Sequence, residues 1–454
     1  MTCHGRTAAR RRQQCTLPTF SSQSETQMGI LIPVVLIFFA CLIIWRACDG
    51  FETASEYIGK DLSEGVRGGT INAISSSLPE LFTTLIALFV LDNVDGFSIG
   101  LGTTAGSALF NGMIIPALCI FAVVGTVVLG TRVNSINVST KVIFRDGLSL
   151  IFCEIVLILL INGNTLYWWQ GLILMGLYGA YLTYMLTSMK SADEQDVRNS
   201  ESRDEEDDET RGWIASAFYW LSGGPALDLE RFFVRDKHRK QIQDQTWNGW
   251  PLLLCSATII GLACFILVEA CEWLGTGPGN GTHASYSFLG YTFTGFGIPT
   301  IFVAVIFASM ATSVPDAVMS IRDAKDGDYD DAVANALGSN IFDICFALGF
   351  PLFIYTILNG PITLSPTVAA QSAELRFLLL CLTVLGFFTY LFGKQHVLPN
   401  GTQYIEMKRG KAALLTFLYL LFAGYVAGLS SNANWAKSIS ESIRGLLDVV
   451  PTPF

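Results

Sequence analysis

The sequence predicts an all-α, polytopic membrane protein of about ten transmembrane helices, arranged as two inverted five-helix repeats. Three observations predict this fold class. The chain is rich in apolar residues and poor in charge. Its long uncharged runs have the length of membrane-spanning helices. One polar segment divides these runs into two equal sets, and the two sets carry related motifs.

The composition indicates that lipid solvates much of the surface. Of the 454 residues, 51% are hydrophobic and 15% are charged, whereas soluble domains carry about 25% charged residues. One large core does not explain this deficit, because cores stop growing near roughly 250–300 residues. The formal net charge is −10, and most of the acidity lies in the segment 193–209. Because no basic stripe is present, we expect no nucleic-acid partner and take the lipid bilayer as the surroundings.

In the first set, uncharged runs mark the helices in order. The run 28–45 lies in the first helix, 81–91 in the second and 113–130 in the third. The fourth and fifth are apolar segments joined by the connection 162–167. The expected helices are 29–58, 65–91, 98–127, 143–161 and 165–187.

In the second set, the sixth, ninth and tenth helices are marked by the uncharged runs 252–268, 377–392 and 412–428. The seventh and eighth helices carry the motifs described below. The expected helices are 251–274, 296–322, 330–358, 374–393 and 411–430. The first, third and eighth helices exceed one bilayer thickness, so we expect them to tilt or extend into water.

The number of helices in each set determines their relative orientation. Five is odd, so the second set enters the membrane from the opposite side, which is the inverted-topology repeat of many transporters. Lys and Arg concentrate in alternate connections, including the polar segment 190–248, and this places that segment in the cytoplasm and both termini outside. The basic residues Arg6, Arg10, Arg11 and Arg12 depart from the pattern and are interpreted as a targeting segment or a translocated tail. The sequon at Asn280 then lies outside and is expected to be glycosylated.

Carboxylates inside apolar segments carry the functional prediction. Placing one at the bilayer centre costs at least about 2.5–3.5 kcal/mol, so each one indicates a partner or a function. Glu80 ends the stretch Ala73-Ile-Ser-Ser-Ser-Leu-Pro-Glu, and Asp316 ends Ser309-Met-Ala-Thr-Ser-Val-Pro-Asp. Both stretches read hydroxyl, hydroxyl, apolar, proline, acid, and both lie in the second helix of their set. This repetition is stronger evidence than either copy alone, because a proline-kinked packing helix with a paired acid would explain a single copy.

The residue types in these stretches suit hard cations. Pro79 and Pro315 lack an N–H and should free a backbone carbonyl one turn earlier, which at membrane depth must meet a cavity, another group or a cation. Further oxygens come from the hydroxyls close to each acid. Oxygen donors of this kind suit Ca²⁺, Na⁺ and K⁺ rather than zinc or copper. The candidate hydroxyls are Ser76, Ser77, Thr312 and Ser313.

A third carboxylate, Asp343, lies in the helix that follows. Its segment Gly338-Ser-Asn-Ile-Phe-Asp matches Gly106-Ser-Ala-Leu-Phe-Asn in the first half. The small residues should allow close helix approach. Glu80, Asp316 and Asp343 together carry about three negative charges, which one Ca²⁺ with one K⁺, or three Na⁺, would balance. Occupation by one ion set or the other is what antiport requires.

These motifs resemble the sodium/calcium exchanger superfamily, the cation/calcium antiporters with two α-repeats. The resemblance runs from Cys48-Asp-Gly-Phe to about residue 358, and weakly beyond. It is closest to the potassium-dependent branch, which pairs a Glu in the first repeat with an Asp in the second. Ala108, Asp343, Phe144-Arg145-Asp146 and Tyr167-Trp168-Trp169 also look like that branch. Ser75 and Ser76 stand where the family usually has Gly, and the Gly-rich stretch 275–281 is unusual.

The resemblance implies a division into domains. They would be an N-terminal tail or targeting segment (1–28), a first transmembrane repeat (29–189, α-1 motif 65–127), a cytoplasmic acidic loop (190–248), a second transmembrane repeat (249–430, α-2 motif 296–358) and a C-terminal tail (431–454).

The resemblance also implies roles. Glu80 and Asp316 would be the primary calcium ligands. The hydroxyls named above, with the carbonyls near Ala73 and Ser309, would serve calcium and sodium. Sodium sites would be lined by Ser107, Asn111, Ser339 and Asp343, and Asp343 would bear on potassium. The first and sixth helices would slide to alternate access.

The sequence therefore predicts a secondary antiporter that exchanges Ca²⁺ for Na⁺, with or without K⁺, and not an enzyme. No cofactor is expected beyond the transported ions, since the four histidines are far apart and the 11 cysteines are scattered through apolar runs. The plasma membrane is the expected location, with an organelle membrane as the alternative. The nearest alternative function is proton/calcium exchange in the same superfamily. A cation channel, or an intramembrane aspartyl protease suggested by Pro225-Ala226-Leu227, is more remote.

Overall fold

The computed structural model describes residues 22–58, 73–91, 93–128, 130–189, 219–234, 247–277, 283–397 and 403–447. The predictions for the first 21 residues, for most of the acidic loop and for Asn280 lie outside these residues.

The first half of the described chain is a helical unit. The helix α1 (Ser22–Ile58) is followed by α3 (Ala73–Ser76) and α4 (Leu78–Val90). Next come α5 (Asn93–Leu109), the π-helical turn η2 (Phe110–Ile114) and α6 (Ile115–Val123), and then α7 (Thr140–Leu160) and α8 (Trp168–Met189). The expected helices are all present in order, and the third runs on through a π-helical turn that the sequence did not predict.

The second half repeats this order. It begins with α12 (Trp250–Gly275) and continues with α13 (Thr300–Val303), the π-turn η4 (Ala304–Ala308), α14 (Ser309–Thr312) and α15 (Val314–Asp326). The next long helix consists of α16 (Tyr329–Phe342), the π-turn η5 (Asp343–Ala347) and α17 (Gly349–Asn359), and α18 (Pro366–Leu391) and α19 (Arg409–Ser430) complete the set. The turns η2 and η5 therefore occupy corresponding places in the two halves.

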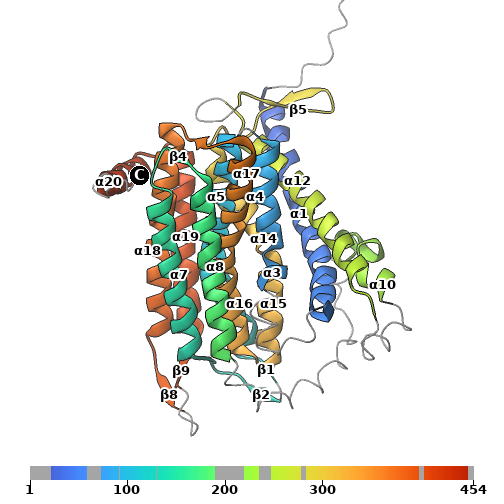
Figure 1. Cartoon of the computed structure of the whole chain (residues 1–454), viewed down its shortest axis with the longest axis vertical. Helices are drawn as coiled ribbons and strands as arrows, with labels where there is room; N and C mark the ends of the chain where they lie inside the picture. The colour runs from blue at the N-terminus through green and yellow to red at the C-terminus, as the bar shows by residue number, and fades with distance from the viewer. Residues whose placement is uncertain are drawn as a thin grey trace, which may run out of the picture.

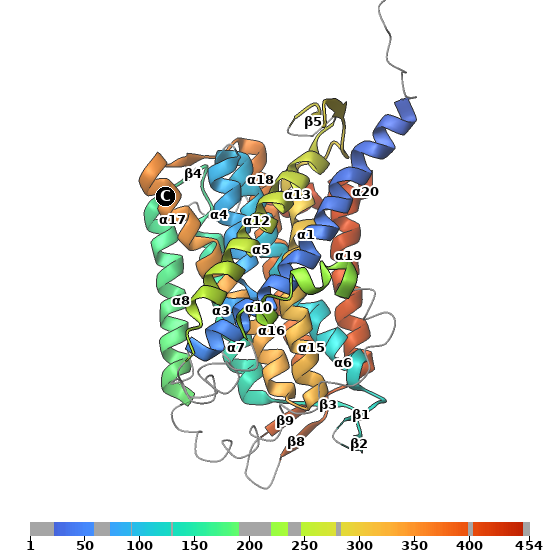
Figure 2. The ribbon, with the colours of Figure 1, turned by 90° about the vertical axis from the view of Figure 1, so that its right-hand side faces the viewer.

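The two halves run in opposite directions. In Figures 1 and 2 the chain rises from α3 to α4 and descends from α13 to α15, and it descends from α5 to α6 and rises from α16 to α17. The helix pairs at the interface are also related by this symmetry. The first helix of each half packs on the second helix of the other, as α1 does on α14 and α12 on α4. Likewise α8 packs on α17 and α19 on α6, and the fourth helices α7 and α18 pack on each other. The inverted five-helix repeat is thus confirmed.

The outer surface has the character of a membrane protein. Within the described residues, six helices are long and apolar enough to cross a membrane, and a seventh span is formed by 300–312 with 314–326, which are bent by 43° relative to each other. Large apolar side chains of α19 such as Phe417, Leu420 and Leu421 are more than half exposed. Lipid contact accounts for this exposure, because no water-soluble surface carries such a band at low cost.

Short strands join the two halves at both ends of the bundle. At the lower end of Figure 1, β3 (Ile136–Ser139) pairs antiparallel with β9 (Gln403–Met407), which also pairs with β8 (Gln395–Val397). At the upper end β4 (Thr165–Leu166) pairs with β7 (Ile362–Thr363). Two local hairpins complete the strands: β1 (Val127–Val128) with β2 (Thr131–Arg132), and β5 (Tyr286–Phe288) with β6 (Tyr291–Phe293).

Two further helices were not predicted. The segment after the acidic run contains a 3-10 turn, η3 (Gly224–Ala226), and the short helix α10 (Leu229–Phe233), which packs beside α1. The expected C-terminal tail contains the amphipathic helix α20 (Asn434–Leu447). It is fastened by the buried carboxylate of Glu374, which accepts hydrogen bonds from Tyr425, from Ser440 at 2.7 Å and from Arg444 at 3.0 Å.

Candidate ion-binding site

The two proline–acid segments break at the same place. Ser77 separates α3 from α4 with φ −93° and ψ 8°, and Ser313 separates α14 from α15 with φ −82° and ψ 0°. In both segments the proline stands two residues later and begins the next helix, where its missing N–H costs nothing. The acid is the next residue, so Glu80 and Asp316 each lie in the first turn of a new helix.

A close crossing brings the two halves together beside these breaks. A Cβ atom on Gly106 of α5 would lie 2.2 Å from the carbonyl oxygen of Val305 and 2.7 Å from Ser309 Cβ. Glycine is therefore required for α5 to rest on η4 and α14. The predicted close approach is confirmed here but not at the equivalent Gly338, where the nearest atom is Tyr181 Oη at 3.6 Å.

Two of the three predicted carboxylates, Glu80 and Asp343, contact one hydroxyl. Glu80, Asp316 and Asp343 are each fully buried. The Ser107 Oγ atom lies 3.1 Å from Glu80 Oε1, 2.9 Å from Asp343 Oδ2 and 2.8 Å from Ser313 Oγ. A hydroxyl has one proton to donate, so it satisfies one of these oxygens at a time. Four elements, α4, α5, η5 and the α14–α15 break, thus meet at a single point.

The amide of Asn111 organises the other side of the site. Its Nδ2 lies 3.1 Å from Asp316 Oδ2, 3.2 Å from Ser339 Oγ and 3.3 Å from Ser107 Oγ. Asn111 lies in η2, and the wider π-helical turn directs its side chain into the centre of the bundle. Asn111 therefore holds Asp316 from the first repeat, while its own Oδ1 remains without a donor.

Several buried oxygens at this point have no hydrogen-bond partner within the described residues. A buried acceptor without a donor is costly, and a buried charge more so, unless a cation or proton compensates it. Of the ion pairs formed by the described residues, none involves Glu80, Asp316 or Asp343. The arrangement offers a cage of hard oxygens with up to three negative charges and no internal counter-charge. The unpartnered atoms are Glu80 Oε2, Asp316 Oδ1, Asp343 Oδ1, Asn111 Oδ1 and Ser77 Oγ.

The remaining candidates are placed as follows. The side chain of Ser76 reaches Asp316, and that of Thr312 lies within reach of Glu80. The Thr312 and Ser309 hydroxyls donate back to carbonyls of their own helix, at 3.1 Å to Ala308 and 2.7 Å to Val305. Ala73 begins α3, and the structure describes its backbone only.

A pocket of about 240 Å³ adjoins this region between α1 and α15. One wall is α1, with Trp45, Cys48, Asp49 and Glu52, and the far wall is α15. Its inner end is lined by Ser75, Ser76 and Pro315 of the two breaks. We call this pocket the α1 path, because its α1 wall carries the acids Asp49 and Glu52; sequence reasoning did not identify it.

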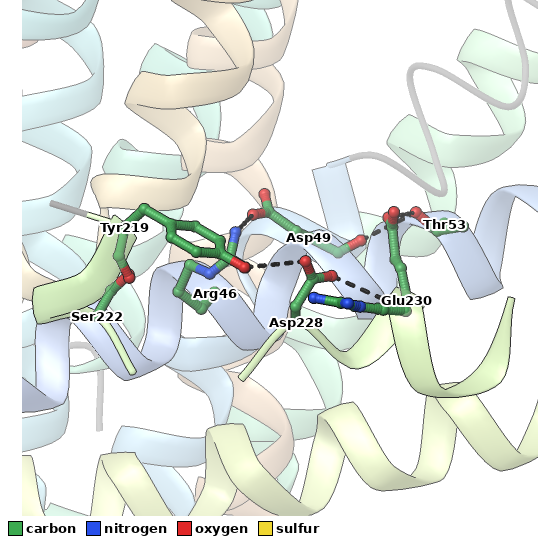
Figure 3. Close-up of polar contacts among 8 residues, drawn as sticks. Arg46, Asp49, Thr53, Tyr219, Ser222, Asp228 and Glu230 are labelled. Atoms are coloured by element: carbon green, nitrogen blue, oxygen red, sulfur yellow. Dashed lines mark hydrogen bonds and ion pairs between the residues drawn. The ribbon is translucent and has the colours of Figure 1, made fainter. Parts of the chain in front are cut away.

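The described part of the insert contacts α1 next to this path (Figure 3). Arg46 of α1 lies 3.5 Å from Asp49 and 3.9 Å from Asp228, which precedes α10. Thr53 of α1 donates a hydrogen bond to Glu230 of α10. Arg46 is thus shared between a carboxylate of the path and a carboxylate of the insert.

Taken together, the inverted repeats, the paired helix breaks and the buried cage of carboxylates define a polytopic membrane transporter for cations. The sequence comparison assigns the family. The family model of the sodium/calcium exchanger protein matches residues 32–187 and 248–428, and the chain belongs to this family. It is therefore a cation/calcium exchanger and an integral membrane protein, not an enzyme, and the predicted resemblance is confirmed.

Individual relatives agree with this assignment. The chain is 24% identical to human sodium/potassium/calcium exchanger 5 over 476 aligned residues, covering 91% of this chain and 87% of that protein. It is 35% identical to mouse sodium/potassium/calcium exchanger 4 over 177 residues, covering 37% of this chain and 26% of that one. Among solved structures, the H⁺/Ca²⁺ exchanger CAX matches with a TM-score of 0.51 at 13% identity, covering 92% of each chain, which supports the fold alone.

Proposed function

We propose that this protein is a secondary active antiporter that exchanges Ca²⁺ for Na⁺ by alternating access, with K⁺ carried together with Ca²⁺. The observation that carries the proposal is the set of unpartnered buried oxygens of three carboxylates, two of which contact Ser107 and the third Asn111. Carboxylate, amide and hydroxyl oxygens are the ligands of Ca²⁺ and of alkali ions. In this proposal Glu80 and Asp316 are the primary calcium ligands.

The charge of the cage supports the ion sets. With all three acids ionised, one Ca²⁺ and one K⁺, or three Na⁺, neutralise the site, and a low-dielectric site cannot hold both sets at once. Asp343 supplies the third charge, so K⁺ binding depends on it. Relatives whose names include potassium support this assignment.

Alternating access follows from the packing of the first helices. α1 and α12 lie against each other and against the proline–acid helices, outside the rest of the bundle (Figure 1). A shift of this pair relative to α4 and α15 would close the path beside Asp49 and open an equivalent one on the other side. We further propose that the insert is cytoplasmic, that Asn280 is glycosylated outside, and that the plasma membrane is the location. The domain boundaries given above belong to the same proposal.

The test is Ca²⁺ uptake into Na⁺-loaded proteoliposomes, with and without K⁺ and with and without a pH gradient. We expect uptake that requires internal Na⁺ and is increased by external K⁺. Uptake driven by a pH gradient without Na⁺ would instead identify a proton/calcium exchanger. Currents far above carrier turnover, with no need for a counter-ion, would identify a channel.

Variants test the residues. Glu80→Gln and Asp316→Asn keep the side-chain volume and remove a charge, so both should abolish uptake. Asp343→Asn should leave Na⁺-dependent Ca²⁺ uptake but remove its stimulation by K⁺. Glu406→Gln in β9, far from the site, is the control for a Glu-to-Gln change. Wild-type flux in both Glu80→Gln and Asp316→Asn would refute the site.

A further inference from the structure

A second buried carboxylate lies away from the ion-binding cage. Glu154 of α7 is 1% exposed. Its Oε1 accepts a hydrogen bond from Thr383 of α18 at 2.7 Å, and its Oε2 has no hydrogen-bond partner within the described residues. Neither oxygen takes part in any of the ion pairs that the structure describes. The function proposed above makes no use of this group.

A cavity of about 350 Å³ adjoins this pair, between α7, α18, α16 and η2. Thr383 lies in its wall, and so do Gly147 and Leu150 of α7. Glu154 follows these two residues on the same helical face, since positions three, four and seven apart share a face. Most of the wall is apolar, with Leu109, Met113, Leu150, Leu337, Leu382 and Phe387.

One polar group separates the cavity from the cage. Asn340 of α16 lines the cavity, is fully buried, and donates a hydrogen bond from Nδ2 to the Ala108 carbonyl at 2.9 Å. Its Oδ1 has no donor in the described part of the chain. The neighbouring Ser339 and the nearby Asp343 face the cage instead. The cavity therefore lies directly behind the helix that carries two residues of the cage.

The surroundings of Glu154 determine which ligand it takes. The thiols of Cys345 in η5 and Cys381 in α18 lie near Glu154, the thiol of Cys153 precedes it on α7, and Tyr178 of α8 stands near Cys345. None of these thiols supplies an oxygen ligand. A metal cation needs several oxygen ligands, and the apolar wall does not provide them. An unpaired carboxylate in such a place is compensated by a proton.

We infer that Glu154 is a proton-binding site, separate from the cation site, and that its occupancy controls how α7 packs against η5. With the proton bound, Glu154 is neutral, accepts from Thr383 and fits the apolar seam between α7 and α18. Without it, a negative charge lies beside η5, in which Cys345 is two positions after Asp343. The charge draws water into the seam and moves η5, so exchange depends on pH through a group that binds no transported metal ion.

Infrared spectroscopy of the full-length protein in lipid tests the binding step directly. Spectra are recorded with saturating Ca²⁺, at a series of pH values, for the wild type and for Glu154→Gln. We expect a carbonyl-stretch band of a protonated carboxylic acid in the wild type that Glu154→Gln removes. Thr383→Val should shift this band to higher frequency, because it removes the one hydrogen bond to Oε1. Asp146→Asn is the matched control: Asp146 lies on the same helix, is fully buried and is paired with Arg145 at 2.6 Å, so the band should remain.

Flux measurements test the coupling. Ca²⁺ uptake in the wild type should change over the pH range in which the infrared band of Glu154 disappears, and Glu154→Gln should remove this part of the profile while retaining uptake. An infrared spectrum of Glu154→Gln identical to that of the wild type would overturn the proton site. Superimposable pH profiles of the two proteins would overturn the coupling to transport. If neither protein transports Ca²⁺, the proposed function fails, yet the infrared comparison still decides the proton site.

Discussion

Replacing Gly106 by Ala tests whether the crossing of α5 over η4 and α14 positions the cage. The added Cβ would lie 2.2 Å from the Val305 carbonyl oxygen, about 1 Å short of ordinary contact. Backbone carbonyls cannot rotate away as side chains do, so the two helices must separate by roughly this amount. Overpacking of this kind costs about 1–3 kcal/mol of stability. Because Ser107 is the next residue, its hydroxyl would move away from Ser313 and Asp343, and a misplacement of about 1 Å costs about 100-fold in rate.

Gly338→Ala provides the matched control, since Gly338 occupies the equivalent place in the second repeat. Its Cβ would meet only Tyr181 Oη at 3.6 Å, and Ala favours a helix over Gly by up to about 1 kcal/mol. Thermal unfolding of fluorescent fusions, followed by size-exclusion chromatography, should show a lower transition temperature for Gly106→Ala and an equal or higher one for Gly338→Ala. Na⁺-dependent Ca²⁺ uptake should fall only in Gly106→Ala. Equal stability and flux in the two variants would refute the argument that this crossing positions the site.

Four other perturbations give distinct results. Ser107→Ala removes the hydroxyl shared by Glu80 and Asp343 and should weaken Ca²⁺ affinity by about tenfold, about 1.4 kcal/mol, in equilibrium ⁴⁵Ca²⁺ binding; unchanged binding would contradict its central place. Asp228→Asn removes the insert carboxylate that shares Arg46, so Arg46 pairs more fully with Asp49, and the KM for Ca²⁺ on the insert side should rise while kcat stays near wild type; a fall in kcat alone would count against the path. Glu374→Ala leaves Arg444 and Ser440 unpaired and should detach α20. Breaking a fully buried ion pair costs about 3–5 kcal/mol, and the partial exposure of Arg444 reduces this cost. Residues 434–447 should lose their protection in hydrogen exchange, and persistence of that protection would argue against the docking of α20. Lowering the pH should weaken Ca²⁺ binding to the cage because protons compete for the three carboxylates, and pH-independent binding would count against an ionised cage.

The site was predictable to the extent that its chemistry is local. Glu80 and Asp316 can be identified from the sequence because burying an acid in an apolar helix costs free energy. The repeat of the proline–acid pattern in the two halves predicts that the two acids meet. The same prolines predicted a freed carbonyl in each helix, and the structure goes further by breaking the two helices at Ser77 and Ser313. Asn111 and Asp343 were identified by their matching segments, although nothing in the pattern shows that Asn111 donates to Asp316.

Other features depend on contacts between distant segments and were not predictable. The π-turns η2 and η5 lie just before α6 and α17, which pack on the fifth helix of the other half, and no local propensity marks them. The path along α1 exists only because Asp49 faces the breaks rather than lipid. The sequence predicts residues 431–454 as a C-terminal tail, whereas the structure has helix α20 there. Its amphipathic pattern and the pairing of Arg444 with Glu374, 70 residues away, fix it instead.

The difference between Asn111 and Asp343 explains how a symmetric fold makes an asymmetric site. Two acids at these equivalent positions would give the cage four negative charges, and Asp316 would face another carboxylate instead of the Asn111 amide that now donates to it. Two amides would leave two charges, enough for Ca²⁺ alone or for two Na⁺. With one of each, the first repeat contributes a donor that holds Asp316 in place and the second contributes the third charge. The inverted repeats therefore supply the geometry, the paired breaks and the shared hydroxyl, while this single departure from symmetry sets the charge that the bound ions must neutralise.

Exchange of the two residues, Asn111→Asp with Asp343→Asn, keeps that charge but removes the donor to Asp316, so the double variant should bind Ca²⁺ more weakly than the wild type. Wild-type affinity in it would show that the charge alone, and not its placement, determines binding.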